Sequence, residues 1–536
     1  LVAKENQPEG RSQARMLTLM AHLQPCCARE RKDTMTALPC ASPLRKKLKI
    51  AILGGGVGGS SLARWLREVY GDNLDLTVIC DGPVGGRCQS ISFEGQEFEA
   101  GASIVSELND HFIALMKKHK LKERCIKDLT YIPTGVFNGK SFAVSTPSPA
   151  SMCFPRLAKP LSAWRLSCKY GFRSLMQLKK LAKGGEAPDF KKLYKAQDDG
   201  QAFTHPTQLL EVLRPGLSEL CLRSAETWLV DDKNISQDLV QQLATGGMRA
   251  NYGGQSCSDL HALVGLVSLA GGLASRCFSV VDGNRQVPLR ELEAAAPRLL
   301  TGTAKLVQKR TDNTGFEVHY FPGATGESMK NQMETPESTG NAKVESFDLV
   351  VIAHALERSG LRIEGYPTAT WQSPGQFQRC VAHFVKGTLR PEYFGTRLHD
   401  MPFEVLTTAD STAPFYSIGL QFPVSLSTAA EAKKIVESAS RGEPQVFKVF
   451  APRVLSKEDL GQIFSPGIGA ETLKFTHVDW YAYPTYEVPQ KLHPFVLDPD
   501  GLFYLNSIEQ AASAMEMSLI SARNAVNLIT EWVDNR

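Results

Sequence analysis

The feature that most constrains this chain is a glycine-rich turn between an apolar run and a helical pattern. Residues 49–53 are mostly apolar, as in a buried strand, and residues 61–67 follow the spacing of an amphipathic helix. Between them, Gly54, Gly56 and Gly59 occupy the glycine positions of the G-x-G-x-x-G dinucleotide fingerprint. One glycine forms the turn, one admits a pyrophosphate and one allows strand and helix to pack closely. The turn therefore predicts a βαβ unit whose helix N-terminus binds phosphate.

The residues that follow argue against the alternative, an ordinary glycine-rich turn of an α/β protein. A second apolar run, residues 74–80, is followed by Asp81, about 20 residues beyond the fingerprint, where a carboxylate binds the ribose. Residues 85–87 are Gly-Gly-Arg, an extension typical of flavoproteins rather than of simple NAD dehydrogenases. Residues 99–103 fit the next turn of a flavin site. We therefore expect the cofactor to be FAD.

The end of the chain is expected to complete the same domain. Residues 501–509 have the pattern of a strand and a turn, and residues 511–532 that of a long helix with small residues at its start. Small residues let a ligand approach, and the helix dipole would stabilise negative charge on a reduced flavin, although tight helix packing also explains them. The expected FAD-binding residues are Gly54, Gly56, Val57, Gly58, Gly59, Asp81, Gly85, Gly86, Arg87, Gly101, Ala102, Ser103, Ser507, Glu509 and Met515.

Composition restricts the class of protein further. At 536 residues the chain is long enough for two or more domains, and its 43% hydrophobic and 22% charged residues are typical of a globular protein. No run approaches the roughly 20 apolar residues of a membrane-spanning helix. A net charge of +4 gives no reason to expect nucleic acid as a partner. The 12 cysteines, without a C-x-x-C pair, give no reason to expect a metal site.

The order of these patterns predicts an α/β fold. We expect a Rossmann-type FAD-binding domain with a discontinuous α+β substrate domain, as in amine-oxidase-like flavoproteins. The segments are a leader or disordered tail at 1–47, FAD-binding parts at 48–125, 246–359 and 498–536, a mainly helical substrate or cap domain at 126–245, and a second substrate-domain part at 360–497. Residues 322–345, rich in polar residues, glycine and proline, are expected to form a mobile loop.

Two stretches carry further interpretations. Residues 164–181 form an amphipathic segment rich in Lys and Arg, which is either a solvated helix face or a surface that associates with membranes. Residues 246–255 combine glycines with Arg, Asn and Tyr, as in a pocket wall or an ordinary turn before a buried helix. The candidate substrate-pocket residues are Arg249, Asn251, Tyr252 and Tyr483.

With these residues in view, the chain resembles the prenylcysteine oxidase family of FAD-dependent thioether oxidases, which includes plant farnesylcysteine lyase. The resemblance runs from about residue 49 to the end. The nucleotide-binding stretches are shared by many flavoproteins, whereas residues 251–253 and 511–518 are more specific. Further matching stretches lie at 95–101, 169–175, 264–269, 406–408, 481–484 and 504–509.

The resemblance implies oxidative cleavage of the thioether in farnesyl- or geranylgeranyl-cysteine during the breakdown of prenylated proteins. In this family a hydride passes from the isoprenoid carbon bonded to sulfur to FAD, water adds, and the adduct collapses to prenyl aldehyde and free cysteine. Molecular oxygen reoxidises the flavin and yields hydrogen peroxide. The family's usual setting is the lysosome or another part of the secretory route. The glycosylation sequon at 234–236 is compatible with that setting, although residues 16–23 give no clear signal peptide.

The chain departs from the family at several positions. Cys80 stands where an acid is expected, with Asp81 one position later, and Ser507 replaces a glycine. Residues 282–284 carry Asp-Gly-Asn where two glycines are expected, and residues 253–254 belong to a loop one residue longer than the family's. No catalytic base can be named: the histidine candidates are His119, His205 and His261, and the candidates for water activation are Glu509 and Glu516.

Two rival functions remain open at this point. A non-catalytic prenyl-binding protein of the same fold would explain the departures and would bind a prenyl group without flavin. Another FAD amine oxidase or desaturase would use amines or polyenes, although residues 511–518 argue against it. The expected partners are prenylcysteine and oxygen, with no metal and no obligate protein partner.

Overall fold

Two sheets and a layer of helices make up the computed structural model of this chain, which describes residues 46–126, 130–146, 158–183, 190–271, 276–323, 342–364, 375–467 and 471–536. Leu38–Arg536 form one unit, and the other, Leu1–Ala37, lies outside the described residues. The predicted leader at 1–47 and most of the predicted loop at 322–345 also fall outside them.

The first sheet has the order β12-β11-β10-β2-β1-β13-β22-β21, with β14 paired to β10. Its centre is parallel, because β1 (Leu48–Leu53) pairs with both β2 (Leu74–Cys80) and β13 (Leu349–Ile352). These three strands are almost entirely buried, as their continuous apolar sequences require. The other strands are β10 (Arg298–Lys309), β11 (Phe316–Pro322), β12 (Lys343–Phe347), β14 (Arg362–Glu364), β21 (Val496–Asp498) and β22 (Leu502–Tyr504).

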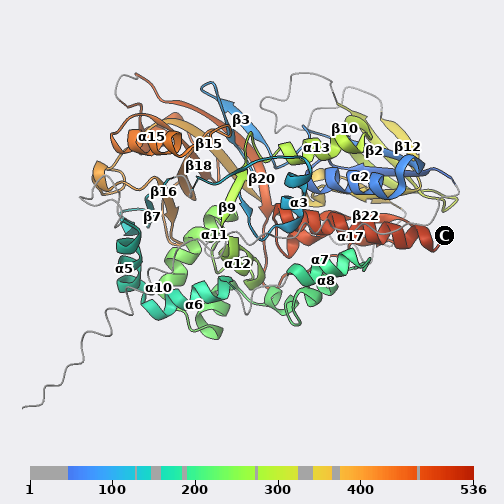
Figure 1. Ribbon diagram of the computed structural model, residues 1–536, viewed down its shortest axis with the longest axis horizontal. Helices are drawn as coiled ribbons and strands as arrows, with labels where there is room; N and C mark the ends of the chain where they lie inside the picture. Colours follow the sequence, from blue (N-terminus) through green and yellow to red (C-terminus); the bar gives the residue numbers. More distant parts are fainter. Residues whose placement is uncertain are drawn as a thin grey trace, which may run out of the picture. The chain divides into compact units, whose positions relative to one another are not determined.

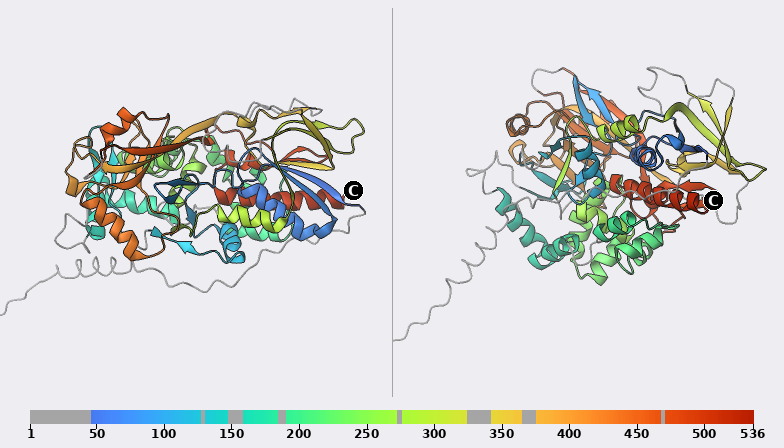
Figure 2. Two further views of the ribbon diagram at one scale, coloured as in Figure 1. Left: turned by 90° about the horizontal axis from the view of Figure 1, so that it is seen from above. Right: turned by 45° about the vertical axis from the view of Figure 1, so that its right-hand side comes forward.

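Helix α2 (Val57–Tyr70) packs between α13 (Gln286–Ala295) and α17 (Met515–Asp534) along this sheet (Figure 2). Helix α17 is buried along most of its length and also contacts α3 (Asp110–Lys118). It begins at Met515, so the expected helix over 511–532 is wrong at its start. A 3₁₀ turn, η9 (Leu505–Gln510), and residues 511–514 precede it.

The second sheet has the order β19-β15-β18-β17-β16-β7-β8, with β20 paired to β15 (Figure 1). Strands β7 (Thr134–Phe137) and β8 (Phe142–Ser145) lie in a region that we expected to be mainly helical. The sequence pattern does not predict them, because both strands are short and β7 pairs in parallel with the distant β16 (Glu404–Thr407). The remaining strands are β15 (Phe377–Leu389), β17 (Ser417–Leu420), β18 (Gln445–Ala451), β19 (Phe464–Ser465) and β20 (Lys474–Pro484), beside α15 (Ala429–Ser440) and α16 (Lys457–Ile463).

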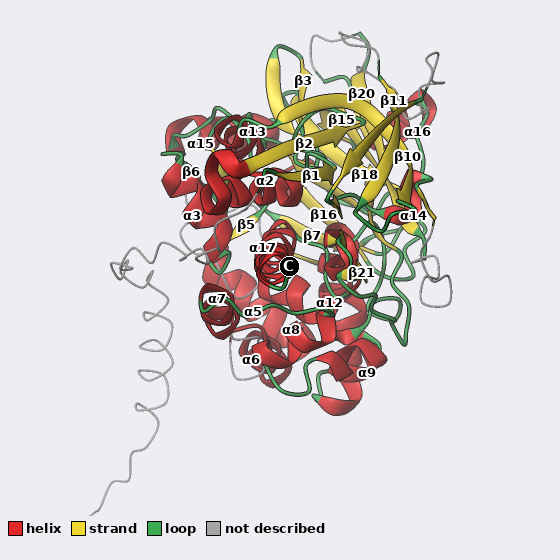
Figure 3. Cartoon of the chain, turned by 90° about the vertical axis from the view of Figure 1, so that its right-hand side faces the viewer, coloured by secondary structure: helices red, strands yellow, loops and turns green. Residues whose placement is uncertain are grey.

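The helical layer lies on the opposite side of α17 from the first sheet (Figure 3). The expected single segment at 164–181 is two helices, α5 (Ala158–Tyr170) and α6 (Phe172–Lys183), separated at Gly171, whose φ is +82°. In the stretch 246–255, which we interpreted as either a pocket wall or a turn, residues 246–251 are helical and belong to α11 (Thr245–Asn251). The other members are α7 (Phe190–Asp198), α8 (Pro206–Leu213), α9 (Ala225–Thr227), α10 (Gln237–Leu239) and α12 (Ala262–Leu269), with the 3₁₀ helix η4 (Ser218–Leu222) and the π-helical segments η5 (Trp228–Asp232) and η6 (Val240–Ala244).

Short elements join these layers. Strands β3 (Ser90–Phe93) and β4 (Gln96–Glu99) form a hairpin, and β9 (Cys277–Val280) pairs with both β5 (Val105–Ser106) and β6 (Glu123–Arg124). The predicted loop at 322–345 begins and ends in strand, since Pro322 closes β11 and Lys343 opens β12. Further short elements are η1 (Gly71–Asn73), α14 (Leu356–Ser359) and η8 (Leu398–Asp400).

Candidate cofactor and substrate site

The three fingerprint glycines have three different environments. Gly54 has a φ of +118°, and a Cβ there would lie 2.6 Å from the carbonyl oxygen of Ala353. A Cβ at Gly59 would clash with the carbonyl oxygen of Gly54, so these two glycines allow the turn and the helix to pack closely. A Cβ at Gly56 would meet no atom within 4 Å. The middle glycine therefore faces open space at the N-terminus of α2, where no side chain caps the first N–H groups.

The second glycine pair borders the same space. The backbone N–H of Gly85 donates to the carbonyl oxygen of Gly55 over 2.8 Å, and Gly56 and Gly85 form a parallel bridge. A Cβ at Gly86 would lie 3.3 Å from the Cα of Gly56. The two glycine motifs are thus held edge to edge, an arrangement that leaves backbone N–H groups and little steric bulk for a pyrophosphate.

Arg87 connects this region to the C-terminal part of the chain. Its Nη2 forms an ion pair with the carboxylate of Glu509, just before α17. Its Nη1 donates to the carbonyl oxygen of Ala482 in β20 over 2.8 Å. The guanidinium also lies over the ring of Phe377, 5.8 Å from its centroid. Arg87 therefore ties the nucleotide domain to the second sheet.

Glu509 is buried and keeps one acceptor free. Its Oε1 accepts from Arg87 and, over 2.8 Å, from the side-chain amide of Asn506. Its Oε2 is also buried but has no hydrogen-bond partner among the described residues. A buried carboxylate oxygen without a donor is costly. A hydroxyl of the ribityl chain of FAD is the kind of donor that would satisfy it, so the residues present fit this cofactor.

Residues 101–103 lie against Arg87. The backbone N–H of Ala102 donates to the carbonyl oxygen of Arg87 over 3.0 Å. A Cβ at Gly101 would clash with that carbonyl oxygen and would lie 2.5 Å from the ring of Trp480 in β20. Ser103 is half-buried on the same segment. The predicted residues at 54–59, 85–87, 101–103 and Glu509 thus come together, while their binding of FAD stays a prediction.

The other predicted C-terminal residues lie close by. The sulfur of Met515, at the start of α17, is 3.3 Å from the thiol of Cys88. Ser507 is fully buried, and its hydroxyl donates to the carbonyl oxygen of His493. Its φ is not positive, so serine fits at this position, where the resemblance predicts glycine. The Ser507 hydroxyl is therefore part of the packing behind the site.

The ribose end of the site carries the other departure. The thiol of Cys80 packs so closely against Gly55 that a Cβ at Gly55 would clash with it, and burial raises the pKa of Cys80 to about 12. Asp81 is exposed, and its charge partly opposes the effect of burial, which lowers the pKa of His354 below its ordinary value. The exposed carboxylate at this edge is thus Asp81, one position beyond the place where the resemblance predicts an acid.

The candidate pocket residues divide into two groups. The ring of Tyr252 packs edge-on against Tyr483 and Tyr486, with centroids 5.2 and 5.7 Å away. Gly253 brings this cluster next to Cys380, because a Cβ there would lie 3.6 Å from both Cys380 and Tyr483. The hydroxyls of Tyr252 and Tyr483 form no hydrogen bond with a described residue. These two tyrosines are therefore the pocket candidates that the structure brings together.

Arg249 and Asn251 have structural partners instead. The guanidinium of Arg249 donates to the hydroxyl of Thr407 and to the carbonyl oxygen of Gly254, each over 3.0 Å. The amide of Asn251 donates to the hydroxyl of Ser268 over 2.9 Å. These contacts tie α11 to β16 and α12. The structure thus gives both side chains a packing role.

The three histidine candidates for a catalytic base also have structural partners. His119 pairs with the buried carboxylate of Glu291. The Nδ1 atoms of His205 and His261 each accept from a backbone N–H in the first turn of the helix that follows, α8 and α12. Burial lowers the pKa of His261 to about 4, so its ring is neutral at ordinary pH. None of the three is placed as a base by these contacts.

Glu516 likewise serves the fold. Its carboxylate accepts from the backbone N–H groups of His111 and Phe112, over 2.9 and 3.0 Å, and from the hydroxyl of Tyr194. It therefore caps α3 from the neighbouring α17. Burial raises the pKa of Glu516 to about 7.

The sequence reasoning missed Glu357. It follows β13 in α14, and its Oε2 accepts from the hydroxyl of Tyr504 over 3.4 Å. Tyr504 is the last residue of β22, which pairs with β13 in the first sheet. Burial and the nearby charge of Glu509 raise the pKa of Glu357 to about 7. The signal was its position at the carboxyl end of a buried parallel strand, where ligands bind in such sheets.

Clusters of metal ligands, membrane-spanning helices and disulfides are all absent from the described residues. They contain no group of three or more His, Cys, Asp or Glu side chains placed to hold a metal ion. Within the same residues, no helix combines the length and apolar character needed to cross a membrane. The eight cysteines among the described residues are all free thiols: Cys80, Cys88, Cys125, Cys168, Cys221, Cys257, Cys277 and Cys380.

The fold and the site define a flavoprotein oxidoreductase of the Rossmann type. The model of the prenylcysteine lyase family matches residues 159–536, and that of an NAD(P)-binding Rossmann-like domain matches residues 52–118. The chain belongs to the prenylcysteine lyase family. The predicted family and fold class are confirmed, and FAD is the cofactor that the site fits.

Individual proteins agree with this assignment. The chain is 30% identical over 519 residues to bovine prenylcysteine oxidase 1, covering 91% of this chain and 89% of the relative. Human prenylcysteine oxidase 1 is 29% identical over 496 residues, covering 90% and 88%. Cyclohexylamine oxidase from Brevibacterium oxydans has the same fold, with a TM-score of 0.53, 15% identity and coverage of 91% of this chain and all of that one.

Proposed function

We propose that this chain cleaves the thioether of prenylcysteine oxidatively, consuming oxygen and water and releasing prenyl aldehyde, free cysteine and hydrogen peroxide. The observation that carries the proposal is the meeting of Arg87, Glu509 and the two glycine motifs in a chain that belongs to the prenylcysteine lyase family over most of its length. The proposed substrate is farnesyl- or geranylgeranyl-cysteine, whose prenyl group needs an apolar surface.

FAD, when bound, supplies the chemistry by accepting a hydride from the carbon next to sulfur and passing the electrons to oxygen. The residues of the chain itself bind and orient the cofactor and the substrate. The glycine motifs and the N-terminus of α2 would hold the pyrophosphate, and the free Oε2 of Glu509 would accept a cofactor hydroxyl. The half-buried ring of Tyr483 in β20 offers apolar surface to the prenyl group, and the buried rings of Tyr252 and Tyr486 pack in the same aromatic cluster. Hydride loss needs no protein base, in agreement with the structural roles of His119, His205 and His261.

The departures from the family do not favour the prenyl-binding alternative. Cys80 and Ser507 are both buried and accommodated by their neighbours, and neither closes the space beside Gly56. The fold supports the amine-oxidase alternative, because cyclohexylamine oxidase shares it, but the family match does not support it. The proposal also includes a lysosomal or secretory setting and no obligate protein partner, both of which rest on the family resemblance. It further includes contact with membrane surfaces, which rests on the basic segment at 164–181.

The visible absorption spectrum of the purified protein, before and after anaerobic addition of farnesylcysteine, tests the proposal. We expect an oxidised-flavin spectrum that bleaches with farnesylcysteine and stays unchanged with cyclohexylamine. Bleaching by the amine alone would establish the amine-oxidase alternative. A protein that takes up no FAD on reconstitution but binds farnesylcysteine would establish the prenyl-binding one.

A further inference from the structure

Helices α5 and α6 are unusual in charge. Helix α5 carries three Lys or Arg residues and α6 carries four, and neither helix contains Asp or Glu. The side chains of Arg165, Arg173 and Lys180 are exposed, and none of them pairs with a carboxylate among the described residues. Elsewhere in the described chain, surface cations often have acidic partners, as Arg223 has Asp232. These three exposed cations therefore have no compensating carboxylate in the part of the chain that the structure describes.

The same helices expose large apolar side chains. Phe172 is 65% exposed, the highest value among the large apolar side chains of the described residues, and Trp164 is 59% exposed. Met176 is 45% exposed and follows Phe172 by one helical turn, as Lys180 follows Met176. Residues four apart share a helix face, so Phe172, Met176 and Lys180 lie in one row on the outside of α6.

The inner faces of the two helices are fixed to the rest of the helical layer. The hydroxyl of Tyr170 donates to the side chain of Gln242 over 3.0 Å, and the amide of Gln177 donates to the carbonyl oxygen of Lys233. Leu178 is buried in the core that α5 and α6 cover. The outward direction of the exposed row is thus set by packing.

We propose that the outer face of α5 and α6, formed by Trp164, Arg165, Phe172, Arg173, Met176 and Lys180, binds the surface of anionic lipid bilayers. Aromatic and apolar side chains enter the headgroup region, and Lys and Arg bind acidic headgroups from the rim. A protein partner fits this face less well, because the centres of protein interfaces are depleted in Lys and uncompensated charge is costly there. This inference rests on the membrane contact in the proposed function, to which it adds the binding residues and the class of lipid, and it does not depend on the proposed reaction.

The experiment is co-sedimentation of the full-length flavoprotein with vesicles of phosphatidylcholine, with and without phosphatidylserine. We expect binding to the anionic vesicles only. The triple variant R165Q/R173Q/K180Q should weaken that binding roughly 100-fold. The matched control K434Q/K457Q/K491Q removes the same charge from other exposed sites and should bind like the parent chain. The double variant W164S/F172S should weaken binding about 10-fold.

Insertion of Trp164 into the bilayer can be measured separately by tryptophan fluorescence. Anionic vesicles should shift the tryptophan emission of the parent chain to the blue, and the W164F variant should lose that shift while still binding. Equal binding of the two triple variants, or no binding of the parent chain to either vesicle, would overturn the proposal. So would concentration-dependent dimerisation in light scattering that the W164S/F172S variant abolishes, since a second copy would then occupy the face. Sedimentation does not depend on turnover, so an inactive enzyme leaves the test intact.

Discussion

Arg87 and Glu509 lie 422 positions apart in the sequence and form an ion pair in which the Glu509 carboxylate is buried. The pair joins the turn after the second glycine motif to the turn before α17, and one of its carboxylate oxygens still lacks a donor. It is therefore the point at which the two ends of the nucleotide domain and the cofactor would meet.

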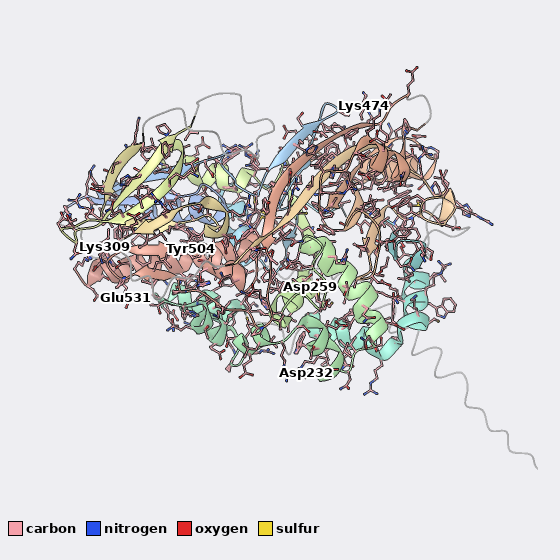
Figure 4. All side chains as sticks on the ribbon, turned by 180° about the vertical axis from the view of Figure 1, so that it is seen from behind. Asp232, Asp259, Lys309, Lys474, Tyr504 and Glu531 are labelled. Atoms are coloured by element: carbon pink, nitrogen blue, oxygen red, sulfur yellow. The ribbon has the colours of Figure 1, made fainter. Side chains whose placement is uncertain are left out.

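The substitution Glu509→Gln should weaken FAD binding by about 10-fold, because it removes one charge-assisted hydrogen bond and leaves the Arg87 charge without its partner. The measurement is a fluorescence titration of the flavin-free protein with FAD. Glu531→Gln is the matched control, since Glu531 lies near the other end of α17 and is exposed (Figure 4). Equal FAD affinity of the two variants would contradict the role given to Glu509.

The fingerprint glycines separate folding from cofactor binding. Gly56→Ala should fold like the parent chain and lose FAD affinity at least about 10-fold, because the added methyl group meets no protein atom and enters the space left for the pyrophosphate. Gly82→Ala is the control, since a Cβ there also meets nothing within 4 Å. Thermal unfolding without FAD and flavin titration together measure both properties.

Gly59→Ala should behave differently, with a loss of folding stability that appears even in the absence of FAD. Its Cβ would clash with the carbonyl oxygen of Gly54 and would lie 3.1 Å from the Cβ of Ala353. An unfolding temperature equal to that of Gly56→Ala would show that helix and strand can separate there without cost.

Ser507 provides a test of the family departure. Changing it to the residue that the resemblance predicts, Ser507→Gly, should lower the free energy of unfolding by roughly 1–2 kcal/mol, because it removes a buried hydrogen bond to the carbonyl oxygen of His493 and frees the backbone. The rate of flavin reduction by farnesylcysteine should stay unchanged, since the hydroxyl points into the packing. Faster flavin reduction in the variant would show instead that the serine impairs the site.

The parts of the fold that local sequence specifies were predictable. The strand, turn and helix around Gly54 follow from residues within about one βαβ unit, because glycine positions and apolar spacing act locally. Strands β7 and β8 were not predictable, because each has only four residues and β7 pairs with β16, which lies far along the chain. The N-terminal end of α17 was also misplaced, because the small residues at 511–514 are as compatible with an extended approach as with a helix.

The site shows the same division. Arg87 and Glu509 were both chosen from the sequence, yet their ion pair depends on how the two ends of the chain pack. The capping of α3 by Glu516 depends on a contact across 405 positions and has no local signal. The capping roles of His205 and His261 did have a local sequence signal, because each histidine directly precedes a helical pattern, as an N-cap residue does.

Glu357 makes the stability of the flavin-free protein depend on pH. Its pKa is about 7 in the folded chain against an ordinary value of 4.5, because burial and the Glu509 charge disfavour ionisation. The folded state therefore holds this proton more tightly, and the stability it contributes is complete below pH 4.5 and is lost as the pH rises through 7. The loss amounts to at most about 3 kcal/mol.

The substitution Glu357→Gln keeps the neutral form at every pH, so it should leave the unfolding temperature nearly unchanged at pH 5 and raise it by a few degrees at pH 8. Thermal unfolding of the flavin-free variant and parent chain at both pH values measures this, with Glu531→Gln as the control that should show no such difference. A variant less stable than the parent at pH 8 would mean that the ionised Glu357 pairs with Arg87, and that Arg87 then holds both carboxylates at the site.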